Sequence, residues 1–254
     1  MLFNIENLGR VELVLGEKLS SNPRWSLRGN SLIIGQYDSG ETHEKHFLQT
    51  IGSGNWYWSE FEEYRFGKTD NLLQSVWFHI REVNLDSEQR LATWQSQPPV
   101  EGLLRLVSSE QLKPEMGDFR FFEPSGKFFT CVTQAALKDS KHRLRLRIAR
   151  DFDLLFADNQ FCGWLLSNPT DYLVYFWEAP CPILQAEDNS LALWVSEYLY
   201  LVAEPYIDLM EEAAPKFREQ LEELHNKIDL NYGAVNQRQI IHDAITDVIE
   251  KFYD

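Results

Sequence analysis

The segment Glu41–His46, with the sequence ETHEKH, contains two histidines and two glutamates, which are ligand types of a zinc site. The histidines are three residues apart, whereas the helical zinc-protease motif places them four apart with a glutamate between them. No third ligand follows nearby in the sequence. We therefore interpret the segment as a polar loop, and we predict no bound metal and no cofactor.

Cys162, in the segment Phe161–Trp164, is the candidate for a nucleophilic thiol. A reactive thiolate needs a helix N-terminus or a basic neighbour to lower its pKa, and Cys162 instead lies within an apolar strand pattern. We expect a packed core thiol, and Cys131 and Cys181 are no better placed. The odd number of cysteines, three, predicts reduced thiols and a cytoplasmic protein.

A hydrolase site is the enzymatic alternative, because aromatic and carboxylate side chains are concentrated over residues 55–64. If this segment is extended, one face carries the residue types of a sugar-cleaving cleft, namely Trp56, Trp58, Glu60 and Glu62. Ser59 and Glu62 equally form a capping box for a short helix that ends at Gly67. We favour a structural role for the segment, since aromatic residues dominate ordinary cores.

Arginines alternate with apolar residues over His142–Ile148, so one face of the expected strand is basic. The basic side chains are Arg143, Arg145 and Arg147, extended by Lys138, Lys141 and Arg150. Guanidinium groups bind phosphate and carboxylate in a bidentate way, so the stripe is a candidate anion-binding site. Intramolecular ion pairing is the simpler interpretation, because the acidic helices that follow in the sequence could lie against it.

Negative charge is concentrated at the C-terminal end. Residues 187–254 carry 15 acidic against 5 basic residues, in a chain whose net charge is −15. The candidate partner-binding surface is the densest acidic group, Glu211, Glu212, Glu219, Glu222 and Glu223. Glu223 and Lys227 form a favourable i, i+4 pair, but Glu219 and Glu223 have the same spacing with like charge. A solvated face is the common explanation of such a block, and attraction of a basic partner is the functional one.

Up to about residue 180 the sequence is typical of short strands separated by turns. Runs rich in β-branched and aromatic residues cover Val11–Leu15, Ser31–Ile34 and Leu72–Ile80. Turn residues at Glu123–Gly126 and Ala157–Gln160 predict two hairpins. The paired strands of these hairpins are Phe119–Phe122 with Phe128–Val132 and Asp153–Phe156 with Phe161–Leu166, and a last strand is expected over Tyr172–Trp177.

After Asp188 the hydrophobic period changes from two to about 3.6 residues. Helices are predicted from Leu191 to Val202, from Pro215 to Gly233 and from Asn236 onward, with a break at Pro205. The predicted fold class is α+β, an antiparallel β-rich N-terminal body of hairpins and a meander followed by a C-terminal helical layer. We assign residues 1–185 to the body and 186–254 to the acidic helical region, packed on it as one unit.

Composition argues against several classes of partner. An acidic chain repels nucleic acid. The first residues do not resemble a signal peptide, and the longest apolar stretch, Leu191–Ala203, is shorter than the roughly 20 residues of a membrane span. We therefore expect a soluble protein with no nucleic-acid partner and no membrane association, whose oligomeric state the sequence leaves open.

The favoured hypothesis is a non-catalytic cytoplasmic protein whose acidic helical surface binds a basic protein partner. Immunity proteins that neutralise a basic nuclease toxin have this charge character, which is an analogy of function and not a sequence match. The alternatives are the hydrolase described above and a scaffold subunit of a larger assembly. The 34 aromatic residues suggest the scaffold, because aromatic side chains often anchor interfaces.

Overall fold

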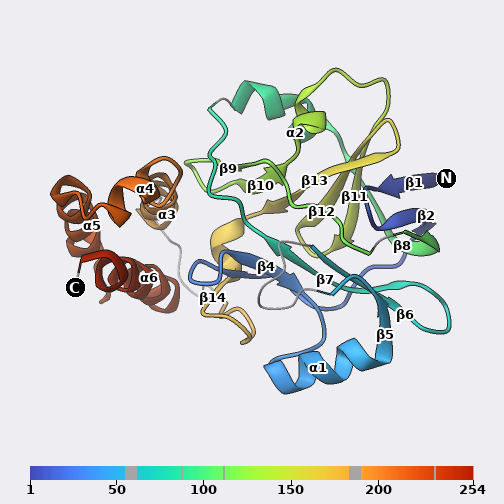
Figure 1. Ribbon diagram of the computed structural model, residues 1–254, viewed down its shortest axis with the longest axis horizontal. Helices are drawn as coiled ribbons and strands as arrows, with labels where there is room; N and C mark the ends of the chain where they lie inside the picture. The colour runs from blue at the N-terminus through green and yellow to red at the C-terminus, as the bar shows by residue number, and fades with distance from the viewer. Residues whose placement is uncertain (55–61, 87, 111, 183–189, 232, 254) are drawn as a thin grey trace.

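The structure is a computed structural model that describes residues 1–54, 62–86, 88–110, 112–182, 190–231 and 233–253. Within these residues, 14 strands form two sheets in the N-terminal part, and the longest helices follow at the C-terminal end (Figure 1). The predicted α+β fold class is thereby confirmed. The expected boundary between residues 185 and 186 lies outside the described residues.

The larger sheet has eight strands, and a parallel bridge between Asn4 and Gln160 brings its first strand back to its sixth. The predicted hairpins form within it, since local turn chemistry pairs adjacent strands. Parallel pairs join strands that are distant in sequence. In spatial order the strands are β1 (Leu2–Ile5), β2 (Gly9–Leu15), β8 (Pro99–Ser109), β11 (Arg143–Ala149), β12 (Phe152–Ala157), β13 (Gln160–Ser167), β10 (Phe128–Val132) and β9 (Phe119–Phe122).

The smaller sheet has six strands, and helix α1 (Gly40–Gln49) covers part of its outer face (Figure 1). Its inner face packs on the larger sheet through aromatic rings. The Trp25 ring stacks on Phe129 at 4.6 Å between centroids, and Phe78 stacks on Phe152 at 5.8 Å. Each such buried ring contributes about 1.5–3 kcal/mol by its removal from water. In spatial order the strands are β14 (Leu173–Val174), β3 (Arg24–Ser26), β4 (Ser31–Ile34), β7 (Leu73–His79), β6 (Glu63–Gly67) and β5 (Thr50–Gly52).

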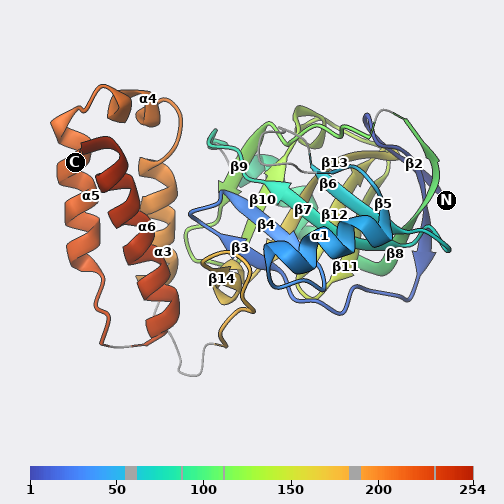
Figure 2. The ribbon, with the colours of Figure 1, turned by 60° about the horizontal axis from the view of Figure 1, so that its bottom comes forward.

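Four helices form a layer beside the β-rich body (Figure 2). They are α3 (Ser190–Leu201), α4 (Tyr206–Glu211), α5 (Pro215–Lys227) and α6 (Val235–Tyr253). Their apolar residues belong to the same core cluster as those of the two sheets. Polar contacts also join the layers: the Tyr175 hydroxyl donates to Asp243 Oδ2 at 2.8 Å, and Arg28 pairs with Asp247. None of the described helices has the length and apolar character needed to cross a membrane.

Three element boundaries differ from the predictions. The second C-terminal helix ends at Lys227 instead of Gly233, and Asn236 lies inside α6 instead of before it. The strand expected over Tyr172–Trp177 is limited to Leu173–Val174. It ends there because the Glu178 carboxylate accepts hydrogen bonds from the amides of the next two residues, which turns the chain.

Several short elements were not predicted from the sequence. The polar-loop interpretation of residues 41–46 is wrong, because they lie within α1. Strands β1, β3, β5, β6 and β8 were not delimited from the sequence either. The other helices that were not predicted are α2 (Ala92–Ser96), α4 and three short 3₁₀ helices at Glu88–Leu91, Gln134–Leu137 and Pro169–Tyr172. All are short, and α1 has no buried residue, so none has the apolar periodicity that reveals a helix in a sequence.

Candidate functional site

The five glutamates predicted to bind a partner are all exposed. Glu211 and Glu212 lie at the C-terminal end of α4, and Glu219, Glu222 and Glu223 lie on α5. Helix α5 is amphipathic, and its apolar side packs on the other helices. In Figure 2, α5 lies on the side of the helical layer that is remote from the β-rich body. The exposed carboxylates of α5, on Glu219, Glu222 and Glu223, are therefore directed away from the basic residues of the sheets.

Few basic side chains neutralise this surface. Glu222 accepts from Arg218 at 2.8 Å. Lys227 pairs with Glu197 of α3 at 3.0 Å, so the expected i, i+4 pair between Glu223 and Lys227 is wrong. Within the described residues, no ion pair involves Glu211, Glu212, Glu219 or Glu223. We call these four residues the acidic surface.

Helices α3 and α4 also expose apolar side chains. Leu193 and Tyr200 of α3 are 54% and 53% exposed, and Leu209 of α4 is 38% exposed. The Tyr200 hydroxyl lies 2.6 Å from that of Tyr206, which holds the ring in place. The helical period of the sequence predicts the buried stripe of α3. Leu193 and Tyr200 fall between the stripe positions, so the same period places them on the other side of the helix.

The ion pair between Glu197 and Lys227 places α3 and α5 side by side. Figure 2 shows the two helices running in opposite directions, and the ion pair between Glu197 and Lys227 fixes their alignment. Tyr200 follows Glu197 by about one turn, and Glu223 precedes Lys227 by one turn, so Tyr200 and Glu223 lie at the same level. An aromatic anchor bordered by carboxylates is a common composition of a protein interface.

The basic stripe of β11 pairs with its neighbouring strand. Asp153 of β12 is fully buried and accepts from Arg145 at 2.5 Å and from Arg147 at 2.8 Å. Arg143 instead donates to the main-chain oxygen of Lys138 at 3.3 Å. The ion-pairing partner is thus Asp153, and the expectation that the C-terminal acidic helices lie against the stripe is wrong for these contacts.

Arg145 has a second role at the end of α2. Its Nη1 donates to the main-chain oxygens of Trp94, Gln95 and Gln97 at 3.1–3.2 Å. The last turn of a helix leaves most of its oxygens without a partner in the helix, and here only that of Trp94 also accepts from the amide of Gln97, at 3.3 Å. With Asp153 and α2 both bound, the guanidinium of Arg145 has little capacity for an external anion.

The candidate hydrolase cleft is described only in part. Trp56, Trp58 and Glu60 lie outside the described residues. Glu62 is 2% exposed, and its Oε2 accepts from the amide of His79 at 2.8 Å. Burial raises the pKa of Glu62, opposed by the contacts with His79. The next residues form strand β6, so the alternative of a short helix that ends at Gly67 is wrong.

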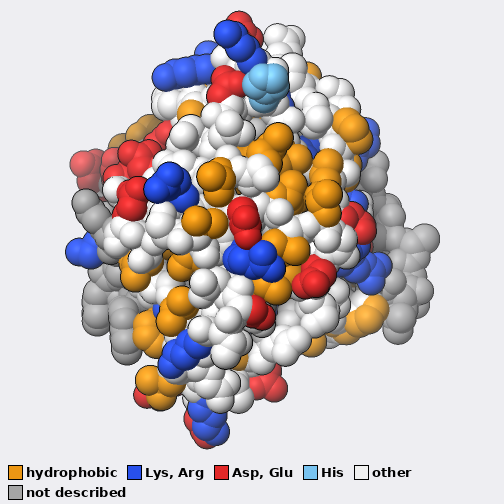
Figure 3. All heavy atoms as spheres, turned by 90° about the vertical axis from the view of Figure 1, so that its right-hand side faces the viewer, with side chains coloured by type: hydrophobic (Ala, Val, Ile, Leu, Met, Phe, Trp, Pro, Cys, Tyr) orange, Lys and Arg blue, Asp and Glu red, His pale blue; other side chains and the backbone are white. Residues whose placement is uncertain are grey.

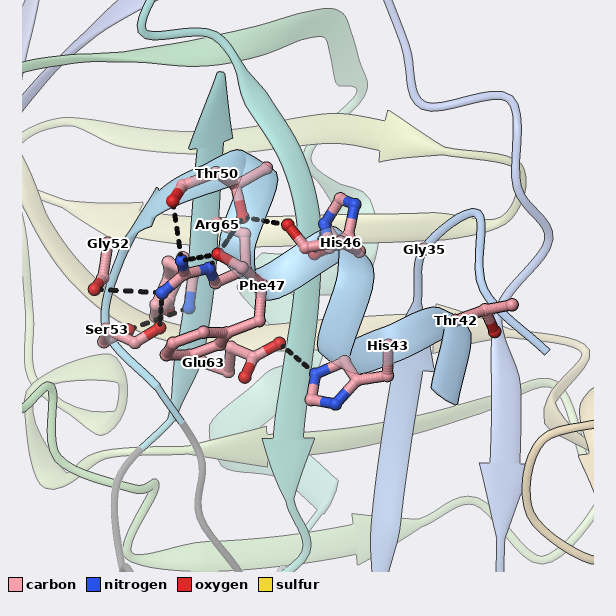
Figure 4. Close-up of polar contacts among 12 residues, drawn as sticks. Gly35, Thr42, His43, His46, Phe47, Thr50, Gly52, Ser53, Glu63 and Arg65 are labelled. Atoms are coloured by element: carbon pink, nitrogen blue, oxygen red, sulfur yellow. Dashed lines mark hydrogen bonds and ion pairs between the residues drawn. The ribbon is translucent and has the colours of Figure 1, made fainter. Parts of the chain in front are cut away.

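The histidines of the former zinc candidate lie on the inner face of α1 (Figure 4). Ser39 and Thr42 form a capping box that starts the helix. His43 Nε2 lies 3.0 Å from Oε1 of the fully buried Glu63. His46 Nε2 lies 2.8 Å from the Ser75 hydroxyl, and burial lowers the pKa of His46. Each histidine thus attaches α1 to a different strand of the smaller sheet.

Arg65 fixes the other end of α1 (Figure 4). Its guanidinium donates to the main-chain oxygens of Phe47, Thr50, Gly52 and Ser53 at 2.8–3.1 Å. It also lies 3.8 Å from the centroid of the Phe47 ring. Arg65 therefore holds the C-terminal end of α1 on β5 and β6. The contact between His43 and Glu63 attaches the same helix to β6 from beneath, so its role is structural.

A hollow of about 360 Å³ lies beside the C-terminal end of α1. It is lined by polar side chains from α1 and from the turn between β6 and β7, including His46, Gln49, Lys68, Asp70 and Gln74. The lining also includes two hydroxyls, on Thr50 and Thr69. The Thr50 hydroxyl donates its hydrogen to the main-chain oxygen of His46 at 2.7 Å, so it is not activated by a side-chain base. In the described part of the chain, no group of three or more histidine, cysteine, aspartate or glutamate side chains is arranged to hold a metal ion.

The three cysteines are unpaired, and two of them are buried. Burial raises the pKa of the Cys162 thiol to about 12, and it also raises that of Cys131. Cys181 is partly exposed, and its sulfur accepts from Asn236 Nδ2 at 2.7 Å. Cys162 therefore lacks the lowered pKa of a nucleophile.

A second face of the molecule, formed by β1, β2 and β8, also exposes apolar side chains (Figure 3). Leu2, Leu15 and Val107 are 50%, 65% and 52% exposed. The charges around them are balanced by two ion pairs, Arg105 with Glu12 at 2.9 Å and Lys18 with Glu101 at 2.6 Å.

No model of a protein family matches the sequence, and no curated protein or solved structure matches the chain at a significant level.

Proposed function

We propose that this chain is a non-catalytic cytoplasmic protein that binds a basic protein through the acidic surface and the adjacent Tyr200. The observation that carries the proposal is the lack of intramolecular ion pairs for Glu211, Glu212, Glu219 and Glu223 within the described residues. Like charges that remain unpaired reduce folding stability, so a function outside folding accounts for them better.

Two further features support a protein as the ligand. Tyr200 is about half exposed beside the carboxylates, and tyrosine at the centre of an interface contributes strongly to binding. The free thiols of all three cysteines are consistent with the reducing cytoplasm. An immunity-type inhibitor of a basic nuclease toxin is one function of this class, in which electrostatic steering provides fast capture.

The enzymatic alternative has weaker support from the described residues. The carboxylates of Glu62 and Glu63 and the thiol of Cys162 are at most 2% exposed, so a substrate does not reach them. The scaffold alternative differs from our proposal in the number of partners, because a scaffold binds several proteins at separate surfaces.

The test compares four forms of the full chain as baits in cells that produce it, with bound proteins identified by mass spectrometry. They are the wild type, a variant with glutamine at the four positions of the acidic surface, Tyr200→Ala and a charge-matched control. The control replaces four exposed acidic residues of the body, Glu6, Glu17 and Glu44 by glutamine and Asp139 by asparagine. Glutamine keeps the size of glutamate, so each charge variant should change the free energy of unfolding by no more than about 1 kcal/mol.

We expect the wild type and the body control to retain one basic protein in stoichiometric amount, and the other two variants to lose it. With the purified partner, the association rate should fall steeply between about 0.05 M and 0.5 M salt for the wild type and less for the acidic-surface variant. Equal loss in the body control, or a rate that does not depend on salt, contradicts the proposal. Several unrelated partners favour the scaffold.

A further inference from the structure

Two histidine rings lie directly against each other between α5 and α6. His225 is in the last turn of α5, and His242 is near the middle of α6. Their ring centroids are 3.7 Å apart, with 37° between the ring planes. Both side chains are partly buried, so the close approach occurs at the seam between the helices and not on the open surface.

The hydrogen bonds define where the next proton on His225 would be added. The Thr246 hydroxyl donates its only hydrogen to the main-chain oxygen of His242 at 3.1 Å. Thr246 therefore accepts from His225 Nε2 at 3.2 Å, so this nitrogen carries the proton of the neutral ring. Acidification adds the second proton at Nδ1 and makes the ring an imidazolium.

Within the described residues, one charged group contacts either ring: His242 Nδ1 lies 3.4 Å from Asp243 Oδ1, whose carboxylate also accepts from Gln239 and Tyr175. The other charged groups on the packed elements have their own contacts or lie exposed. They are Arg218 with Glu222 on α5, Lys227 of α5 with Glu197 of α3, the buried Arg238 of α6 with the main-chain oxygen of Asp229, Asp247 of α6 with Arg28, Glu178 after β14 and the exposed Asp208 of α4. One carboxylate thus faces two imidazoles.

Burial, and next the neighbouring His242, lower the pKa of His225, while Asp243 acts in the opposite direction. The folded state therefore binds a proton on His225 less readily than the unfolded chain. Its stabilising contribution is present above the ordinary histidine pKa and is lost as the pH falls below it.

We propose that the His225–His242 pair is an acid-sensitive latch, which holds the C-terminal half of α5 on α6 while His225 is neutral and releases it when His225 takes up its second proton. A positive charge on His225 is poorly accommodated in this seam, because the ring lies 3.7 Å from that of His242 and the Asp243 carboxylate contacts His242, not His225. The apolar contacts of Leu221 and Leu224 retain the helix at neutral pH.

The latch has a consequence for binding that rests on the proposed function. Helix α5 carries Glu219 and Glu223, so its release alters the spacing between these carboxylates and Tyr200 of α3. A basic partner bound at neutral pH would then dissociate faster in acid. Opening of the latch itself does not depend on whether a partner exists.

The test measures amide hydrogen exchange of the full chain at about pH 7.5, 6.5 and 5.5, across the ordinary histidine pKa, with rates corrected to protection factors. We expect the protection factors of Leu221 and Leu224 to fall in acid. The fall should be about tenfold for each unit by which the pKa of His225 is lower in the folded than in the unfolded state. The protection of Val195 on α3 should change less. If the ratio of the protection factors on α5 to that on α3 is the same at all three pH values, the proposal is overturned.

His225→Gln is the matched variant, because a glutamine amide can still donate to Thr246 but does not titrate. Its α5 protection should be independent of pH, whereas the exposed His142→Gln, in the body, should behave as the wild type does. If His225→Gln is unstable, His242→Gln gives a second comparison, because loss of the neighbouring ring should weaken the acid response. If α5 of a folded His225→Gln variant still loses protection in acid, or α5 of His242→Gln loses as much as the wild type, the proposal is overturned. Salt-independent binding with an intact acid response contradicts the proposed function alone.

Discussion

Arg120 of β9 donates through Nη2 to the main-chain oxygen of Leu199 at 2.6 Å, which joins the larger sheet to the last turn of α3. The same nitrogen lies 3.2 Å from the oxygen of Val202, and Nε donates to Asn84 at 2.8 Å. Arg120 is fully buried, and a helix end in the core needs such donors because its last carbonyls have no partner within the helix.

Arg120→Met should destabilise the protein by about 2 kcal/mol, since it keeps the apolar stem but removes the guanidinium donors. The oxygen of Val202 loses its contact with Arg120, and that of Leu199 keeps only the longer bond from Asn84 Nδ2, at 3.3 Å. Urea unfolding followed by circular dichroism measures the loss. Arg10→Met provides the control, because Arg10 is exposed on β2 and should change stability by less than about 0.5 kcal/mol. Equal midpoints for the two variants would show that Arg120 does not join the layers.

Asp153→Asn should cost about 3–5 kcal/mol, because it leaves the buried Arg145 without its counter-charge. The comparison is Glu12→Gln, which breaks the exposed pair with Arg105 and should cost less than about 1 kcal/mol. Both free energies of unfolding can be obtained in the same denaturant series. A smaller loss for Asp153→Asn than for Glu12→Gln would contradict the assignment of the buried pair.

Glu62→Gln tests the buried carboxylate near the candidate hydrolase cleft. Because burial raises the pKa of Glu62, its ionised form is disfavoured in the folded state, and wild-type stability is lost as the pH rises from the unfolded toward the folded pKa. The variant lacks this penalty. Its thermal midpoint should therefore equal or exceed that of the wild type at neutral pH and match it more closely in acid. A lower midpoint only at neutral pH would indicate that ionised Glu62 is stabilising.

The sequence predicted well those elements that depend on local chemistry. The turn Glu123–Gly126 forms between β9 and β10 because Gly126 adopts a positive φ of 76°, which other residues rarely take. A Cβ at this glycine would also meet Cβ of Ala192 at 2.8 Å. The second requirement arises from the packing of α3 on the body, and local sequence carries no sign of it.

Helix α1 and the partner of the arginine stripe were missed for different reasons. The inner face of α1 carries His43 and His46, whose partners come from β6 and β7, so the helix has no apolar stripe to detect. Asp153 lies directly opposite Arg147 on the next strand, but the pairing of β11 with β12 was not among the predicted hairpins. The net charge of a whole segment therefore points to the acidic helices and does not reveal a single aspartate on the adjacent strand.

Only part of the candidate partner surface could be predicted from the sequence. The density of acidic residues is enough to identify the glutamates of α5 as a surface group, and they are exposed in the structure. Their lack of neutralising partners did not follow, because Lys227 is drawn to Glu197 on a helix that is distant in sequence. Contacts between helices therefore decide which carboxylates remain available.

Thiol labelling separates a packed Cys162 from a nucleophilic one. At about pH 8, a thiol whose pKa is raised to about 12 is almost entirely protonated, so the native protein should label slowly at Cys162. Cys131 should be equally slow, because burial also raises its pKa. Cys181 is partly exposed and should react first. Mass spectrometry should find one fast label per folded chain and three after denaturation.

Cys181→Ser is the control for this experiment, because it should remove the fast label and leave the two slow ones unchanged. Serine can still accept the hydrogen bond from Asn236, so the fold should be maintained. Fast, stoichiometric labelling of Cys162 in the native chain would contradict its burial. That outcome would restore the nucleophile hypothesis, and a covalent catalytic role would then have to be weighed against partner binding.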